Sequence, residues 1–432
     1  MTRMKKRLWL GILVAFVLSA FSIAKTLDVW IVGWTNEMTK IAEDLIATEY
    51  TSKTGVKVNI TPIGWADGNK ITLAIISNDA PDIVSAGVEL GIRGSLIDLR
   101  KTFGNEFEEL ESTLFPAITK QLHFEGTRFA IPQNISVMNA AYRTDILAEM
   151  GLEIPVTWNE VYLIRPKLNA NGREMAFHYG SPDYSSIWGA YTLITQHGGN
   201  FYKTDGFTSA MDEPESIRGF TEYVELYTKH KMPLSVTGIT QFRSGELAMM
   251  IDGYWMYTNL LQSAPEIAGK WEAGLIPGTK RLDGTVNHGT FTGGTHFAIP
   301  TTTKNKQQAW DFIKWFLSSE IQRKYVDLII NRIPGSLMVP TSMAALYNLE
   351  GLPGNIAQVI HAQVDESVPV PYAPTQSVLH RFVAFAIQSC IQLGSDPEAE
   401  AKNAAIEMNK EMDRRKIEYK RFLDQLAKES TI

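Results

Sequence analysis

The N-terminal part of the chain shows short apolar runs that alternate with amphipathic stretches. The apolar run 27–32 and the alternating segment 56–60 each predict a strand. Between them, a polar start followed by apolar residues at helical spacing predicts a helix that ends at Gly55. A helix over 71–76 and a short strand over 81–86 follow. This strand–helix order predicts a mainly parallel sheet with right-handed crossovers, whose ligands gather at the carboxyl ends of the strands.

A second α/β block is expected in the rest of the chain. The pattern predicts a strand over 248–251 and a strongly amphipathic helix over 307–324. A charged helix over 399–428 carries apolar residues at a spacing of about 3.5, which favours a helix packed on a domain surface over a coiled-coil partner. The other expected helices are 146–150, 191–197 and 214–230.

The first 24 residues have the pattern of a cleaved secretory signal. Four cations lie within residues 1–7, an apolar run covers 8–21, and small residues follow at 22–24. The apolar run is shorter than the roughly 20 residues that a membrane-spanning helix needs, so an uncleaved anchor is the weaker alternative. The only cysteine, Cys390, lies far from this region, which leaves no thiol for a lipid anchor and no disulfide. We therefore expect a soluble protein free in the periplasm.

Length and composition reduce the number of possible functions further. A chain of 432 residues is longer than one core usually organises, so two domains are expected. The formal net charge is −6, and removal of the leader's cations makes the mature chain more acidic, which argues against nucleic acid as a partner. The chain has no nucleophile elbow, zinc-protease or phosphate-loop motif, and its eight histidines show no metal-ligand spacing. We expect neither a catalytic centre nor a metal or other cofactor.

Several segments together resemble the extracellular solute-binding proteins of bacterial ABC importers, in the carbohydrate-binding group that includes the maltose-binding protein. No single segment is specific to this group, but the order and spacing of the segments along the chain are specific to it. They include Ala-Pro-Asp-Ile-Val, Gly-Glu-Leu-Ala-Met-Met-Ile-Asp-Gly-Tyr-Trp and Ala-Trp-Asp-Phe-Ile-Lys-Trp-Phe. The matching segments are 80–84, 129–132, 141–147, 155–160, 245–255, 293–300 and 309–316.

The resemblance implies an α/β fold of two lobes, with the ligand cleft between them and three crossing hinge segments. By analogy, the N-terminal lobe covers 25–135 plus 295–335, and the C-terminal lobe covers 136–294 plus 336–432. Several hinge segments allow the lobes to bend toward each other while they prevent free swivelling.

The resemblance also implies three ligand-binding residues. Trp255 and Trp188 match aromatic residues that stack on sugar rings, and Glu89 matches a carboxylate that accepts hydrogen bonds from sugar hydroxyls. Sugar rings offer C–H faces to aromatic planes, and their hydroxyls need carboxylate, amide or guanidinium partners. Further candidates lie in loops suited to these roles: Trp34, Asn36, Trp65, Asp67, Gln133 and Arg332.

Structural alternatives stand beside these roles. The tryptophans could be core residues, Glu89 could be a solvated charge, and Arg332 could form a hinge salt bridge or suit an anionic ligand. The chain also departs from the maltose-type pattern, because Ala86 stands where that group has a tryptophan. The layout of the subsites therefore differs, and maltose is not carried over as the ligand.

The resemblance implies a monomeric receptor that captures a solute, closes, and delivers it to a membrane permease. A di- or oligosaccharide is the expected ligand. Two alternatives remain open: a receptor for a phosphorylated or polyol ligand such as a glycerol phosphate ester, and an exported polysaccharide-active enzyme. The first requires a buried cation in the cleft, and the second requires two carboxylates that face each other across it.

Overall fold

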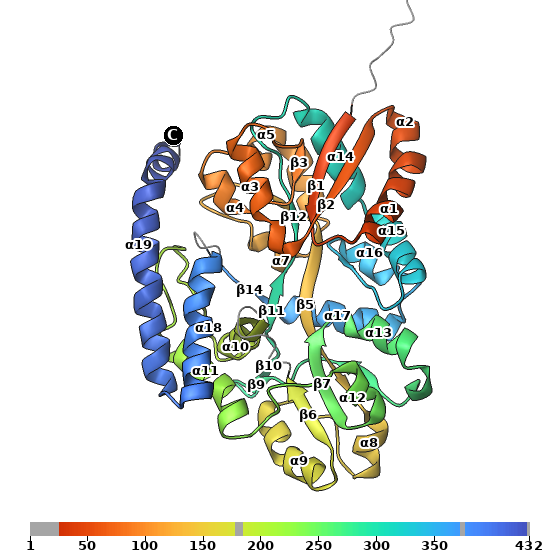
Figure 1. Cartoon of the computed structure of the whole chain (residues 1–432), viewed down its shortest axis with the longest axis vertical. Helices are drawn as coiled ribbons and strands as arrows, with labels where there is room; N and C mark the ends of the chain where they lie inside the picture. The colour runs from red at the N-terminus through yellow and green to blue at the C-terminus, as the bar shows by residue number, and fades with distance from the viewer. Residues whose placement is uncertain (1–25, 178–184, 372–375, 430–432) are drawn as a thin grey trace, which may run out of the picture.

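The computed structural model describes residues 26–177, 185–371 and 376–429, which form two lobes, one above the other in Figure 1. The leader expected at residues 1–24 lies outside this part of the chain. We call the upper lobe, which contains the first strand, the N-lobe and the lower one the C-lobe.

The N-lobe is built on a three-stranded parallel sheet in the order β2-β1-β3. Val29 in the central strand pairs with Ile60 on one side and Ile83 on the other. This confirms the parallel sheet that the apolar runs predict. The strands are β1 (Thr26–Val32), β2 (Lys57–Ile63) and β3 (Ile83–Val84).

Helices cover this sheet. Thr35 caps the first of them by accepting a hydrogen bond from the backbone N–H of Met38 at 3.1 Å. The helical stretch passes through a π-helical turn (Ile46–Thr51) and ends at Gly55, as expected, in the left-handed conformation with φ 73°. The helices of this lobe are α1 (Asn36–Leu45), α2 (Ser52–Thr54), α3 (Asn69–Ile76), α4 (Val88–Ile92), α5 (Leu99–Phe103), α6 (Asn105–Glu111), α7 (Pro116–Lys120), α14 (Lys306–Leu317) and α15 (Ser319–Arg332).

The helix predicted over 307–324 is wrong as a single element. The chain forms α14 and α15, with Ser318 between them in an extended conformation (ψ 144°). The Ser318 hydroxyl donates to the carbonyl of Trp315 at 2.7 Å, so it satisfies one of the carbonyls at the end of α14. The apolar pattern continues through the break, because both helices pack on the same core.

A larger sheet forms the C-lobe and part of the junction. Its order is β14-β11-β5-β7-β6, and β8 and β13 pair with β5 outside this path. The long central strand β5 (Asn134–Tyr142) pairs antiparallel with β7 (Leu247–Gly253). The other strands are β4 (Ile131–Pro132), β6 (Glu174–Phe177), β8 (Glu272–Gly274), β9 (Thr279–Lys280), β10 (Val286–Asn287), β11 (Phe291–Gly293), β12 (His296–Phe297), β13 (Val339–Pro340) and β14 (Val368–Pro369).

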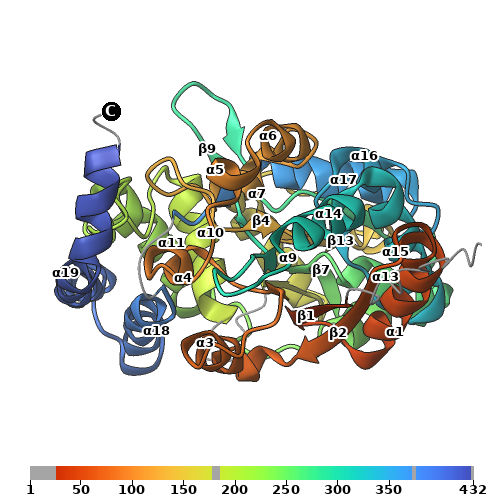
Figure 2. The ribbon, with the colours of Figure 1, turned by 90° about the horizontal axis from the view of Figure 1, so that it is seen from above.

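The helices of the C-lobe surround this sheet. The last one is 33 residues long and confirms the charged helix predicted at the end of the chain. Figure 2 shows α18 and α19 at one end of the molecule, with α1 and α15 at the other. The helices of this lobe are α8 (Thr144–Glu149), α9 (Trp158–Ala170), α10 (Ser185–Gln196), α11 (Pro214–Thr228), α12 (Ile239–Ser244), α13 (Met256–Ser263), α18 (Gln376–Leu393) and α19 (Pro397–Glu429), and α16 (Met343–Tyr347) and α17 (Gly354–Glu366) lie near the junction.

Three segments cross between the lobes. The first leads from β4 into β5, the second from β11 into β12, and the third from α15 through β13. These crossings and the two α/β lobes confirm the predicted fold class, whereas the expected lobe boundaries at 135, 295 and 335 stay predictions. Among the described residues, no helix combines the length and the apolar character needed to cross a bilayer.

Candidate functional site

The carboxyl ends of the N-lobe strands face the junction between the lobes. The chain passes from β11 in the large sheet to β12 beside β4, and Ala298 then forms an antiparallel bridge with Val84 of β3. β3 therefore runs toward the junction. β1 and β2 end there too, because both run parallel to it. The loops after these strands lie where ligand-binding loops of a parallel sheet are expected.

β7 ends at the same junction from the opposite side. β5 leads away from the junction into the C-lobe, and β7 pairs antiparallel with it, with Met138 opposite Gly253. β7 therefore runs back toward the N-lobe, as its arrowhead shows in Figure 1. Trp255 comes two residues after its last residue, so this tryptophan and the N-lobe loops belong to facing strand ends.

Two of the predicted tryptophans are exposed at these strand ends. The Trp255 side chain is 44% exposed, and its ring lies against Gly253, where a Cβ atom would come within 2.1 Å of the indole. Trp65 is 70% exposed, and its ring lies over Gly33 at the end of β1, where a Cβ would come within 2.5 Å. The two glycines allow each indole to lie flat on a strand end. Each lobe thus presents one aromatic surface at the junction.

Polar candidates follow the same strand ends in the N-lobe. Asn36 is exposed at the first position of α1, and Asp67 forms an exposed ion pair with Lys70 at 3.2 Å. The Asp67 side chain can turn toward a ligand at little cost, because exposed ion pairs of this kind contribute little to stability.

Glu89 is only partly exposed and has partners. Its Oε1 atom lies 2.9 Å from Nη2 of Arg93 on the same helix and 3.3 Å from the hydroxyl of Tyr419 on α19. Neither partner is among the site residues predicted from the sequence. The spacing of four residues, which places two side chains on one face of a helix, could have identified Arg93, whereas Tyr419 is 330 residues away in sequence.

Trp188 is partly buried in an aromatic cluster of the C-lobe. Its ring stacks on Phe291 with centroids 3.7 Å apart and lies edge-on to His380 at 5.3 Å. Phe291 belongs to β11, which leads into the second crossing segment. Trp188 is therefore next to a hinge strand, with one ring face covered by protein.

Three other candidates, Trp34, Arg332 and Gln133, lie outside this group. Trp34 is 7% exposed and packs on Phe316 and Tyr325, a placement that favours the core alternative. Arg332 pairs with Asp44 of α1 at 3.5 Å, so both charges of this salt bridge lie in the N-lobe.

Gln133 is fully buried at the crossing segments. Its Oε1 accepts a hydrogen bond from the Thr295 hydroxyl at 2.5 Å, and its backbone N–H donates to the Thr295 carbonyl at 2.8 Å. Gln322 donates to the Gln133 carbonyl at 3.3 Å. The residue therefore joins two crossing segments and α15.

Residues 35–323 match the family of bacterial extracellular solute-binding proteins. This chain belongs to that family. The match includes both sides of the junction described above. The protein is accordingly a transport receptor and not an enzyme.

Relatives of this solute-binding protein share its length and fold. The diacetylchitobiose binding protein DasA of Streptomyces coelicolor is 21% identical over 406 residues, which cover 90% of each chain. The sugar-binding protein MalE of Xanthomonas citri has a similar structure, with a TM-score of 0.78 and 16% identity over 92% of this chain and 99% of that one. A solute-binding protein of Thermotoga lettingae, bound with α-D-tagatose, has a TM-score of 0.71 and 22% identity over 90% of this chain and 100% of that one. At these identities the structures establish the fold alone.

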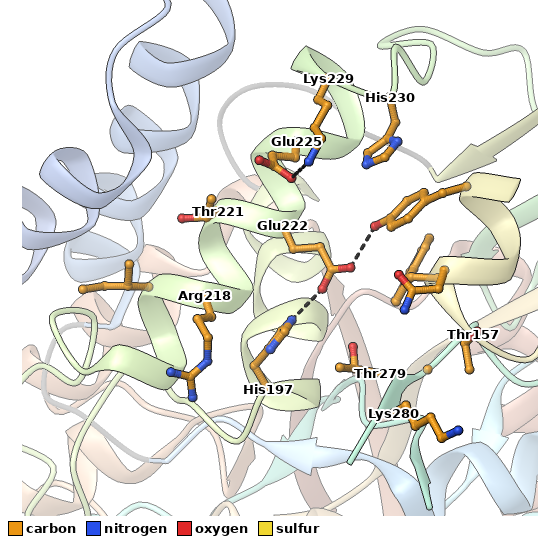
Figure 3. Close-up of a pocket in the computed structure, with 15 residues that line it drawn as sticks. Thr157, His197, Arg218, Thr221, Glu222, Glu225, Lys229, His230, Thr279 and Lys280 are labelled. Atoms are coloured by element: carbon orange, nitrogen blue, oxygen red, sulfur yellow. Dashed lines mark hydrogen bonds and ion pairs between the residues drawn. The ribbon is translucent and has the colours of Figure 1, made fainter. Parts of the chain in front are cut away.

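A separate groove of about 520 Å³ lies within the C-lobe of this receptor, between α9, α10, α11 and β9 (Figure 3). Glu222 accepts a hydrogen bond from Tyr162 at 2.9 Å and lies 2.5 Å from His197, while Tyr162 stacks on His230 with centroids 3.8 Å apart. None of the predicted ligand residues lines it. Its central polar groups bind one another, so we do not assign it to the transported solute.

The receptor shows no metal centre in the described part of the chain. There, no three His, Cys, Asp or Glu side chains lie together in a way that could hold a metal ion. Cys390 is buried, and burial raises the pKa of its thiol to about 12, so it stays protonated and unreactive at neutral pH.

Proposed function

We propose that this protein is the extracytoplasmic receptor of an ABC importer and that it binds a sugar between its lobes. The observation that carries the proposal is the pair of exposed tryptophans, Trp255 and Trp65, at strand ends that face each other across the junction. Closure of the lobes would bring one aromatic surface to each side of a flat ligand. A permease in the inner membrane would then receive the solute from the closed form.

The chemistry of these residues suits a carbohydrate. An indole packs on the C–H face of a pyranose ring, and each face so buried removes apolar area from water. Glu89, Asn36 and Asp67 supply carboxylate and amide oxygens for the hydroxyl rim. These groups accept hydrogen bonds from hydroxyls without requiring any charge on the ligand.

Known relatives support the ligand class. The Streptomyces coelicolor relative is named for diacetylchitobiose, and the Thermotoga lettingae structure holds tagatose. We propose a di- or oligosaccharide, because an aromatic surface on each lobe can contact separate rings.

The charges of the described residues favour a neutral ligand. Arg93, the cation beside Glu89, already lies 2.9 Å from Glu89 and 3.4 Å from Glu418. Arg332 forms an ion pair with Asp44 of α1. A phosphate ester would need a cation that is not already neutralised.

Transport follows from a shift between open and closed forms. A sugar that contacts both lobes binds the closed form better, so binding raises the population of that form. The three crossing segments restrict the motion to bending about the hinge. We propose that the chain is exported by the leader at 1–24 and acts as a monomer in the periplasm.

A thermal-shift screen of residues 25–432 tests the proposal, because a ligand that binds only the folded state raises the melting temperature. The panel contains mono-, di- and oligosaccharides, polyols and phosphate esters, and product analysis follows each addition. We expect a shift with a neutral sugar, no turnover, and loss of the shift in Trp255→Ala. Shifts with phosphate esters alone would contradict the neutral ligand, and consumption of a glycan would contradict the receptor function.

A further inference from the structure

The last helix of the C-lobe reaches the N-lobe. Figure 1 shows α19 rising along the side of the molecule to the level of α4, and Figure 2 places it at the same end as α18. It packs on α11 and α18, its first half contributes apolar residues to the core of the C-lobe, and Asn409 accepts a hydrogen bond from the backbone N–H of Ser209 at 2.8 Å. The helix is therefore held by the C-lobe, while its later turns contact residues of the N-lobe.

Polar contacts join these later turns to α4. Nη2 of Arg93 lies 3.3 Å from the Tyr419 hydroxyl and 3.4 Å from Oε1 of Glu418, and the guanidinium lies 5.7 Å from the centre of the Tyr419 ring. The Tyr419 hydroxyl in turn donates to Oε1 of Glu89 at 3.3 Å. One tyrosine of the C-lobe thus contacts both members of an ion pair in the N-lobe.

Apolar contacts strengthen the same connection. Tyr419 is 3% exposed and belongs to a core cluster that also contains Ala86 and Val88 of the N-lobe. Phe422 packs near Phe129 with ring centroids 5.9 Å apart. The Tyr419 ring is therefore fixed by packing, and its hydroxyl has a defined position. Burial raises the pKa of Tyr419, so the hydroxyl keeps its proton at neutral pH.

Both hydrogen bonds to Glu89 go to the same oxygen. Arg93 and Tyr419 donate to Oε1, and Oε2 accepts no hydrogen bond from any described residue. A carboxylate held by two donors on one oxygen keeps the other oxygen in a defined direction. Glu89 lies at the junction end of β3, where the proposed sugar site is located.

We propose that Tyr419 is a positioning residue that orients the ligand carboxylate Glu89 from the opposite lobe. The inference rests on the proposed function and deepens it. Because the hydroxyl belongs to the C-lobe, Glu89 has this orientation only when the lobes are in the arrangement described here. The contact thereby ties the orientation of Glu89 to this arrangement of the two lobes. We call the set of contacts between Glu418, Tyr419 and Phe422 on α19 and α4 and Phe129 of the N-lobe the cross-lobe clasp.

The test compares full mature chains that carry Tyr419→Phe, Glu89→Gln or both. Tyr419→Phe removes only the hydroxyl and keeps the packed ring, and Tyr347→Phe on α16, where the side chain is 51% exposed, is the matched control. The probes are the sugars of the thermal-shift panel, with diacetylchitobiose included, and affinity is measured by calorimetry. We expect Tyr419→Phe to weaken binding roughly 3- to 10-fold, as the loss of one partly solvated hydrogen bond to a carboxylate implies.

The double variant distinguishes positioning from a general structural role. If Tyr419 acts through Glu89, Tyr419→Phe weakens binding in the wild-type background and has no further effect in Glu89→Gln. Independent losses in the two backgrounds, or equal affinities of Tyr419→Phe and wild type, would overturn the inference.

Small-angle X-ray scattering without ligand tests the clasp independently of the sugar. Tyr419→Ala and Phe422→Ala remove its packing, and both should increase the radius of gyration, whereas Tyr347→Phe should not. If the wild-type chain binds no sugar, the proposed function fails, and the scattering alone tests whether the clasp holds the two lobes together. Unchanged dimensions in both alanine variants, with melting curves that show folded protein, would overturn it.

Discussion

Trp188 and Phe291 stack with ring centroids 3.7 Å apart and planes inclined by 26°. Trp188 lies on α10, whereas Phe291 begins β11, the strand that leads through the second crossing into the N-lobe. The stack therefore fastens a helix of the C-lobe to a hinge strand. A tryptophan in this position contributes to stability whether or not it also contacts a ligand.

Trp188→Ala should lower the free energy of unfolding by about 2–4 kcal/mol, because truncation of a packed aromatic residue leaves a cavity. Trp255→Ala should cost less than about 1 kcal/mol, since that side chain is 44% exposed. Urea unfolding followed by circular dichroism measures both values. Equal losses in the two variants would contradict the different environments of the two tryptophans.

Trp255→Ala should instead reduce affinity. Burial of one indole face on a sugar contributes about 1.5–3 kcal/mol, so its loss should raise Kd roughly 10- to 150-fold. Titration calorimetry with the sugar identified by thermal shift measures the change. Leu282→Ala, at a fully exposed site between β9 and β10, is the control and should bind like the wild type. A Trp255→Ala chain of undiminished affinity would remove this residue from the site.

Gln133→Ala should act through the hinge. The substitution leaves the Thr295 hydroxyl without its 2.5 Å partner in a buried position, although Asn134 Oδ1 at 3.2 Å offers a poorer one. We expect a loss of about 1–3 kcal/mol in unfolding free energy. In a double-mutant cycle with Thr295→Val the losses should not add, because both substitutions break one hydrogen bond. Lost binding at unchanged stability would favour the ligand role expected from the sequence.

The regular patterns explain why the fold was predictable. The apolar runs that form β1 and β7 and the cap at Thr35 are local signals, and the structure confirms the strands and the helix start. Ser318 shows the limit of such local signals. Its extended backbone ends one helix and precedes the next, although the apolar pattern continues on both sides of it. Amphipathic periodicity indicates which face of a helix is buried, but it does not indicate whether the helix continues without a break.

The site was less predictable, because contact with a ligand depends on tertiary position. Trp34 and Trp65 follow neighbouring strands and look alike in sequence, yet one is 7% exposed and the other 70%. The hydrogen bond between Tyr419 and Glu89 joins residues 330 positions apart, and no local pattern encodes such a pair. Resemblance identified Glu89 as a candidate, but only the structure shows what holds it.

His380 should make the protein less stable in mild acid. Its side chain is 5% exposed, and burial lowers the pKa of its imidazole to about 3, whereas an unfolded histidine has a pKa of about 6.5. As pH falls below about 6.5, the imidazole binds a proton in the unfolded chain but not in the folded chain. The free energy of unfolding therefore decreases below that pH, by at most ~1.4 kcal/mol per pH unit. His296, whose pKa burial lowers to about 4, acts in the same direction. His380→Leu should therefore reduce the slope of unfolding free energy between pH 6.5 and 5 without abolishing it, and His123→Gln, which removes a partly exposed imidazole, is the control. An unchanged slope in His380→Leu would mean that this imidazole is protonated in the folded state.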